Sequence, residues 1–190
     1  MLHYPYHTKE GPHDVSTRNI TLTAMLTALL CIVGPLTLAL GPIPLSLTTA
    51  VLMLTALLMP PGSAVLCCVL YLLMGLIGLP VFSGFTGGLG ALAGPTGGFL
   101  LGYLPLTALC SVLSQRTGKR GWHALIFAAG TLILYAMGTA WYAWQTASSL
   151  PAAAAVCVLP FLPGDAIKII AVVHGGNAVK TRLKKAGLLR

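Results

Sequence analysis

Residues 79–103 read LPVFSGFTGGLGALAGPTGGFLLGY and lie between two long apolar segments. The stretch carries no charge, and seven glycines precede Phe99 in it. A soluble linker normally contains solvating residues such as Ser, Glu or Lys. In a membrane, irregular backbone is tolerated only where protein buries it or where it lines a cavity, because each unpaired N–H or C=O is costly there. Since glycine also lets a ligand approach the backbone closely, we interpret this stretch as one wall of a binding cavity.

The composition of the whole chain indicates an integral membrane protein with one compact domain. Of its 190 residues, 56% are hydrophobic and only 7% are charged. A soluble domain has about 25% charged residues, enough to cover a water-facing surface. The net charge of +8 is not a sign of nucleic-acid binding, because the basic residues flank apolar segments instead of forming a patch with interleaved aromatic residues.

The apolar segments predict an all-α fold with six membrane-spanning helices, each of which needs about 20 residues to cross the hydrocarbon. A segment at 145–163 is broken by three prolines and predicts a short helix, re-entrant or packed over the cavity. Residues 1–17 are expected to form a cytoplasmic tail, 18–180 the membrane domain and 181–190 a basic cytoplasmic tail. The predicted spans are 18–40, 47–59, 63–78, 95–114, 122–144 and 164–180, of which 47–59 is short.

The distribution of lysine and arginine predicts the orientation in the plasma membrane. With six spans, Lys9, Arg18, the 116–120 loop and the C-terminal cluster share one side. The loops at 41–46, 79–94 and 145–163 share the other side and contain no lysine or arginine. Basic residues favour the cytoplasmic side, so both termini should be cytoplasmic. The three Pro/Gly-rich loops should then be extracellular and cap an outward-facing pocket.

Asp165 and Lys168 are the only charged residues well inside the predicted spans. They are three residues apart at the start of the last helix and therefore share a face. Ionisable residues in a membrane are costly and usually face a cavity or a partner. One interpretation is that the two residues bind a ligand, with Asp165 accepting hydrogen bonds from its N–H donors and Lys168 pairing with an anionic group. The other is an ion pair that neutralises itself and caps the helix, where a carboxylate is favoured.

The sequence does not indicate an enzyme, a cofactor or a metal site. A single acid in the spans cannot form a catalytic carboxylate pair, and no Walker A motif is present, so ATP hydrolysis is excluded. The five cysteines lie inside apolar runs without CxxC spacing, which is typical of small buried hydrophobic residues. Three histidines in the N-terminal tail are loosely spaced, which favours a frayed tail over a metal site.

Four motifs in order give the chain a resemblance to a known family. They are PIP at 42–44, GLIGLPVFSGFTGG at 75–88, GPTGGFLLGY at 94–103 and PFLPGDAIK at 160–168. With these motifs the chain resembles the BioY family, the biotin-specific substrate-capture (S) components of energy-coupling-factor (ECF) transporters. The resemblance implies a six-helix membrane domain whose outward-facing pocket binds biotin with high affinity.

The resemblance also implies which residues bind the substrate. Asp165 is expected to accept the ureido N–H groups of biotin. Three roles stay open for Lys168: donating to the ureido carbonyl, pairing with Asp165, or meeting the carboxylate of biotin. The implied substrate-binding residues are Asp165, Lys168, Phe82, Ser83, Gly87, Gly88, Pro44 and Thr48.

Two residues depart from the family pattern near this pocket. Thr48 stands where the family commonly has glutamine after its PxP loop, and Phe99 stands where GPTGGY is common. Either change removes a possible hydrogen bond near the ligand.

Ala24 and Ala28 are four residues apart and share a helix face. Small residues at this spacing allow close helix packing in lipid, within the chain or with a partner. In S components such a face on the first helix packs on the coupling transmembrane subunit, which two ATPases drive. The expected partners are therefore biotin, membrane lipid, that subunit and the two ATPases. The alternative is a stand-alone secondary transporter or facilitator for biotin or a similar small vitamin, although the chain shows no convincing internal repeat.

Overall fold

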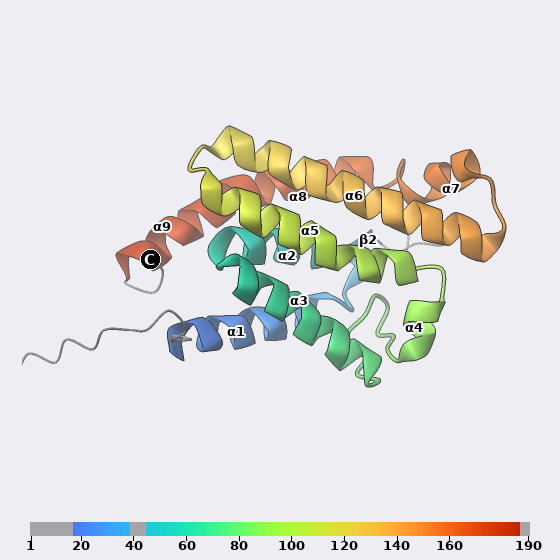
Figure 1. Cartoon of the computed structure of the whole chain (residues 1–190), viewed down its shortest axis with the longest axis horizontal. Helices are drawn as coiled ribbons and strands as arrows, with labels where there is room; N and C mark the ends of the chain where they lie inside the picture. The colour runs from blue at the N-terminus through green and yellow to red at the C-terminus, as the bar shows by residue number, and fades with distance from the viewer. Residues whose placement is uncertain (1–16, 39–44, 187–190) are drawn as a thin grey trace, which may run out of the picture.

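The computed structural model describes residues 17–38 and 45–186, which fold almost entirely into helices (Figure 1). The predictions for residues 1–16, for Pro44 and for residues 187–190 lie outside this part of the chain. The elements are α1 (Thr17–Val33), β1 (Thr37–Leu38), β2 (Leu45–Ser46), α2 (Thr48–Leu58), α3 (Pro61–Leu76), α4 (Leu89–Ala93), α5 (Gly97–Arg116), α6 (Arg120–Thr146), α7 (Leu150–Cys157), α8 (Leu162–Ala171), the π-helix η1 (Val172–Gly176) and α9 (Asn177–Lys185).

The predicted helical architecture is confirmed. Within the described ranges, α5 and α6 are each long and apolar enough to cross a membrane. A third candidate span combines α7 with the helix Leu162–Lys185, bent by 48° at the break between them. Helices α1, α2 and α3 are apolar but shorter than a full span. The count of six spans therefore stays a prediction.

Two predicted helix boundaries are wrong. The first helix does not reach residue 40 but ends at Val33, and Thr37–Leu38 pairs antiparallel with Leu45–Ser46. Pro35 explains this end, because proline lacks an N–H and disfavours helix in the residue before it. Pro95 does not open the fourth helix either; it precedes the N-cap residue Thr96, and α5 begins at Gly97.

Two further segments differ in detail from the prediction. The glycine-rich loop is not wholly irregular, since it contains the short helix α4. The last predicted span is a continuous helical segment from Leu162 to Lys185, interrupted by the π-helical turn η1. The short helix expected within 145–163 is present as α7.

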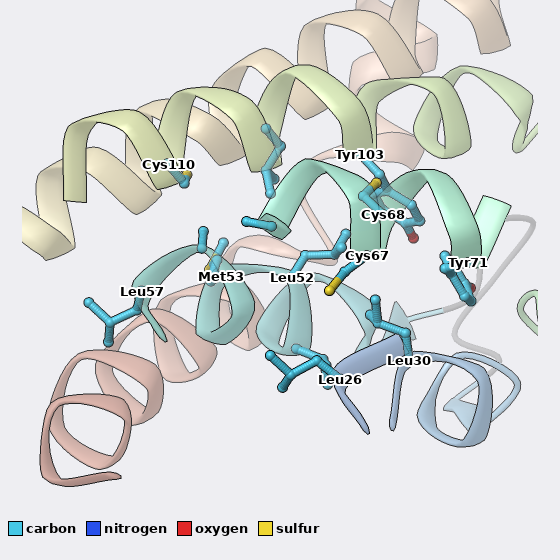
Figure 2. Packing of buried hydrophobic residues seen from close by; sticks show 14 of the residues in the cluster. Leu26, Leu30, Leu52, Met53, Leu57, Cys67, Cys68, Tyr71, Tyr103 and Cys110 are labelled. Carbon is cyan, nitrogen blue, oxygen red and sulfur yellow. The ribbon is translucent and has the colours of Figure 1, made fainter. Parts of the chain in front are cut away.

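The hydrophobic core lies where α1, α2, α3 and α5 meet (Figure 2). Leu52 and Met53 of α2, Cys67 of α3 and Leu30 of α1 are fully buried there. All five cysteines are unpaired, and only Cys31 is more than slightly exposed. They are therefore small hydrophobic packing residues, as the sequence predicts.

Helices α5 and α6 run side by side along their length, and glycines line their contact (Figure 1). A Cβ at Gly98 of α5 would lie 2.8 Å from the carbonyl oxygen of Met137 on α6 and closer still to the Trp141 side chain. A Cβ at Gly130 of α6 would lie 2.5 Å from the Cys110 sulfur. Because small residues let backbones approach in lipid, these glycines set the distance between the two longest helices.

The basic residues gather at one end of the molecule. In Figure 1 the start of α1, the α5–α6 connection and α9 lie at the same end, and α4 and the α6–α7 connection lie at the opposite end. The first end carries Arg18, the residues Arg116, Lys119 and Arg120, and the basic residues of α9. The described loops at the other end contain no lysine or arginine.

Replacing Gly98 with alanine tests the close contact between α5 and α6. The added Cβ requires the two helices to separate, so we expect the free energy of unfolding to fall by about 1–3 kcal/mol. The measurement is chemical unfolding of the protein in detergent. Gly121→Ala in α6 is the matched control, because a Cβ there meets nothing within 4 Å. Equal effects of the two substitutions would contradict this account of the packing.

Candidate functional site

A cavity of about 510 Å³ lies between the glycine-rich loop, α5, α6 and α8. Its size falls within the usual range for small-molecule sites, about 300–1,000 Å³. The glycine-rich loop forms one wall, as expected from its composition. The lining residues are Ser46, Thr49, Phe82, Ser83, Thr86, Gly87, Gly90, Ala91, Gly94, Pro95, Thr96, Phe99, Leu100, Tyr103, Leu134, Tyr135, Phe161, Asp165 and Lys168.

A buried ion pair lies in the wall formed by α8. The Lys168 Nζ is 2.7 Å from the Asp165 Oδ1, and the two residues are only 7% and 5% exposed. Pro163 in the first turn helps to start α8, so both residues share one helix face three positions apart. Tyr135 of α6 donates its hydroxyl to the other carboxylate oxygen, Oδ2, at 2.5 Å.

Lys168 also ties α8 to the start of α2. Its ammonium donates to the Ser46 carbonyl oxygen at 2.6 Å and to the Thr49 hydroxyl at 3.4 Å. With Asp165, these contacts give each of its three N–H donors an acceptor. Such saturation is what a buried charge requires, since desolvation is otherwise not offset.

The Asp165 carboxylate retains capacity to accept further hydrogen bonds. An ionised carboxylate offers roughly four lone-pair positions. Among the residues that the structure describes, Tyr135 and Lys168 are the hydrogen-bond donors to its side chain. Because Asp165 lines the cavity, the remaining positions are available to N–H groups of a ligand.

Backbone contacts hold the glycine-rich wall in place. The Val81 carbonyl oxygen accepts a hydrogen bond from the Tyr71 hydroxyl at 3.0 Å, and Phe82 packs edge-on against the Tyr71 ring at 5.6 Å. The Gly88 N–H donates to the Gly75 carbonyl oxygen at 2.6 Å. Gly88 has a φ of +84°, a conformation that glycine adopts without strain.

The far end of the wall is attached to α6. Trp141 donates its indole N–H to the Gly94 carbonyl oxygen at 2.9 Å, and Gln145 donates to the Ala93 carbonyl oxygen at 2.9 Å. These two side chains donate to carbonyl groups at the end of α4, where a helix leaves its last carbonyl groups without intrahelical partners. They therefore fix α4 against the end of α6.

The chain is similar to known proteins along most of its length. A sequence model of the BioY family matches residues 7–185. The chain belongs to the BioY family. It is 35% identical over 162 residues to the biotin transporter BioY2 of Lactococcus lactis subsp. cremoris (strain MG1363), covering 85% of this chain and 89% of that protein. It is 32% identical over 177 residues to the biotin transporter BioY of Rhizobium etli (strain ATCC 51251 / DSM 11541 / JCM 21823 / NBRC 15573 / CFN 42), covering 87% of this chain and 94% of that protein.

A solved structure shares the fold of this BioY family member. It is the crystal structure of the S-component for biotin from an ECF-type ABC transporter. The TM-score is 0.80 at 27% sequence identity, and the match covers 88% of this chain and 91% of the other. The helical arrangement described above is therefore that of an ECF S component.

The structure brings five of the predicted BioY site residues together around the cavity: Phe82, Ser83, Gly87, Asp165 and Lys168. Two others lie outside the lining. Gly88 is the N-cap residue of α4, and Thr48 is fully buried, where it shares a hydrogen bond with the Ser46 hydroxyl. Pro44 lies outside the described residues. Ala24 and Ala28 both lie on the exposed face of α1.

Sequence reasoning missed several lining residues that carry polar groups, among them Tyr135, Ser46 and Thr49. Tyr135 is a hydroxyl-bearing residue inside an apolar segment, and that was a usable signal, since a buried tyrosine hydroxyl normally finds a partner. Ser46 contributes its backbone carbonyl oxygen to Lys168, which no side-chain pattern reveals. Phe99, one of the two departures from the family pattern, lines the cavity.

Removing one member of the buried ion pair should destabilise the fold more than removing both. Lys168→Met leaves the Asp165 carboxylate without its counter-ion, and we expect the free energy of unfolding to fall by about 3–5 kcal/mol. The double variant Asp165→Asn, Lys168→Met leaves no charge uncompensated, so its loss should be smaller. Chemical unfolding in detergent measures both. A double variant less stable than Lys168→Met would show that the remaining charge is not the cause.

Proposed function

We propose that this chain binds biotin in the cavity and serves its uptake as the S component of an ECF transporter, not as an enzyme. The observation that carries this proposal is the buried Asp165–Lys168 pair, with spare acceptor capacity, in the wall of a cavity of small-molecule size. Membership of the family and the likeness to a biotin S-component structure support the same substrate.

The cavity wall has a polar part and an apolar part, and each matches a different part of biotin. Its cyclic urea offers two N–H donors, which suit the free lone pairs of Asp165. Tyr135 and Lys168 hold that carboxylate in one orientation, so little ordering is needed when the ligand binds. We assign Lys168 the role of fixing Asp165, since its donors are already used.

Apolar side chains are suited to the ring and alkyl chain of biotin. Phe82, Phe99, Leu100, Leu134 and Phe161 line the cavity. Burying apolar ligand surface against them contributes roughly 25 cal/mol per Å². Ser83 and Gly87 complete this part of the wall and let the backbone approach the ligand.

The proposed topology has six spans, with both termini cytoplasmic and the cavity facing outward. The spans are α1, α2, α3, α5, α6 and the segment from α8 through α9. The gathering of basic residues at the end that holds α9 supports this orientation. At 11 residues α2 is only about 17 Å long, short of the roughly 30 Å hydrocarbon core. Its near-complete burial supports shielding by neighbouring helices.

The proposed partners are a coupling transmembrane subunit and two ATPases. A chain without a Walker A motif must take its energy from elsewhere. Ala24 and Ala28 are exposed on α1 while Thr23 and Thr27 face the core, so the small-residue face is available to a partner helix.

Asp165→Asn tests the proposed contact with the urea. Asparagine keeps the shape but loses the charge that strengthens both hydrogen bonds, so we expect biotin affinity to fall at least about a hundredfold. The measurement is equilibrium binding to the detergent-purified protein. Thr131→Val, one turn from Tyr135 and outside the cavity lining, is the control and should bind like wild type, since the Thr131 hydroxyl donates to the Phe127 carbonyl oxygen of its own helix.

Two results would count against this proposal in different ways. Tight biotin binding by the Asp165→Asn variant would assign Asp165 a structural role only. No binding by folded wild-type protein would overturn the substrate.

The double variant Ala24→Leu, Ala28→Leu tests the docking face. Both positions are exposed, so biotin binding by the isolated protein should be unchanged, while uptake by cells with the coupling module should fall at least about tenfold. Radiolabelled biotin uptake and copurification with the coupling subunit measure this. Ala136→Leu, Ala140→Leu makes the same change on the exposed face of α6 and should keep uptake. Lost binding would instead indicate a packing role for the α1 face.

A further inference from the structure

We infer that the cavity recognises the urea end of biotin and that no charged side chain recognises its carboxylate. The substrate class would then include neutral esters and amides of biotin as well as the free acid. This inference rests on the proposed function, and it adds which end of the ligand determines affinity.

The first argument is that the sequence contains few cationic residues that could pair with the biotin carboxylate. Between residues 19 and 115 there is no lysine or arginine, and between 121 and 179 there is only Lys168. The two histidines in the described part of the chain do not supply a cation in the cavity. His123 is hydrogen-bonded to the Thr117 carbonyl oxygen near the basic end of the molecule, and His174 is exposed on η1; neither lines the cavity. Among the residues that the structure describes, Lys168 is the one cationic side chain that lines the cavity and could pair with a carboxylate there.

The hydrogen-bonding capacity of the Lys168 ammonium is already taken up by contacts within the chain. Its three N–H donors are directed at Asp165, the Ser46 carbonyl oxygen and the Thr49 hydroxyl, and its side chain is buried. Binding the biotin carboxylate would require breaking the ion pair with Asp165. That exchange would also place two carboxylates beside one ammonium in a low-dielectric site, which is unfavourable.

The position of the ion pair relative to solvent gives the second argument. Asp165, Lys168 and Tyr135 are buried, whereas the lining residues Thr86, Gly90 and Pro95 of the glycine-rich loop are exposed. A ligand with its urea on Asp165 therefore extends toward an exposed rim. There the carboxylate keeps its water, which avoids the cost of burying an unpaired charge.

The uncharged groups at the exposed rim can raise the affinity for biotin only slightly above the affinity for its neutral esters and amides. The rim includes Thr96, the N-cap residue of α5, and the partial positive charge of a helix N-terminus favours an anion. At an exposed site this preference amounts to a few-fold in affinity. A direct ion pair inside the cavity would instead give more than tenfold.

Competition binding to the purified full-length chain in detergent tests the inference. The probes are biotin, its methyl ester, its primary amide, and an analogue with one ureido nitrogen methylated. We expect the ester and the amide to bind within about fivefold of biotin, and the N-methylated analogue to bind more than tenfold more weakly.

Each other result has a definite meaning. A loss of more than fivefold for both neutral-tail compounds would overturn the inference and indicate a charged contact to the carboxylate, with Lys168 as its source. Unweakened binding of the N-methylated analogue would also overturn it, because the urea would not be what is recognised. If biotin itself fails to bind folded protein, the proposed function fails, whereas a loss confined to the ester and amide leaves biotin as the substrate.

Discussion

The structure depends on an ion pair placed where water cannot help to stabilise it. Asp165 and Lys168 are stable there because each N–H donor of the ammonium has an acceptor and each carboxylate oxygen accepts a hydrogen bond: Tyr135 donates to one carboxylate oxygen, and the Ser46 carbonyl oxygen accepts from the ammonium. Those contacts join α6, α8 and the start of α2, which are distant in sequence. The same interactions that offset the cost of burying the charges also fix the orientation of the proposed recognition group, Asp165, so stability and the proposed binding depend on the same contacts.

In this protein, glycine residues set the distances between neighbouring backbone segments. Along α5 and α6 it brings two backbones together, and in the loop at 79–94 it lets the chain turn and lie against α3. The cavity lies between the α5–α6 contact and the contact of the 79–94 loop with α3. Its shape is therefore fixed by main-chain geometry, and the few polar side chains supply chemical selectivity.

The sequence predicted the parts of this arrangement that follow from local chemistry. Apolar length predicted the helices, and the spacing of Asp165 and Lys168 predicted a shared face next to a glycine-rich wall. The end of α1 at Val33 was missed because the apolar length of the segment was given more weight than Pro35, although that proline is a sequence signal for a helix end. The role of the Ser46 carbonyl and of Trp141 depends on contacts across the fold, where side-chain identity gives no distance.

The π-helical turn η1 has a consequence for how the last helix is built. A π turn holds one more residue than an α turn, and Asn177 satisfies the widened turn by donating its side-chain amide to the Val173 carbonyl oxygen. Removing one residue there would restore regular winding and rotate α9 by about 100° relative to α8. The angular register between the cavity-lining residues of α8 and the basic face of α9 is therefore set by a single extra residue.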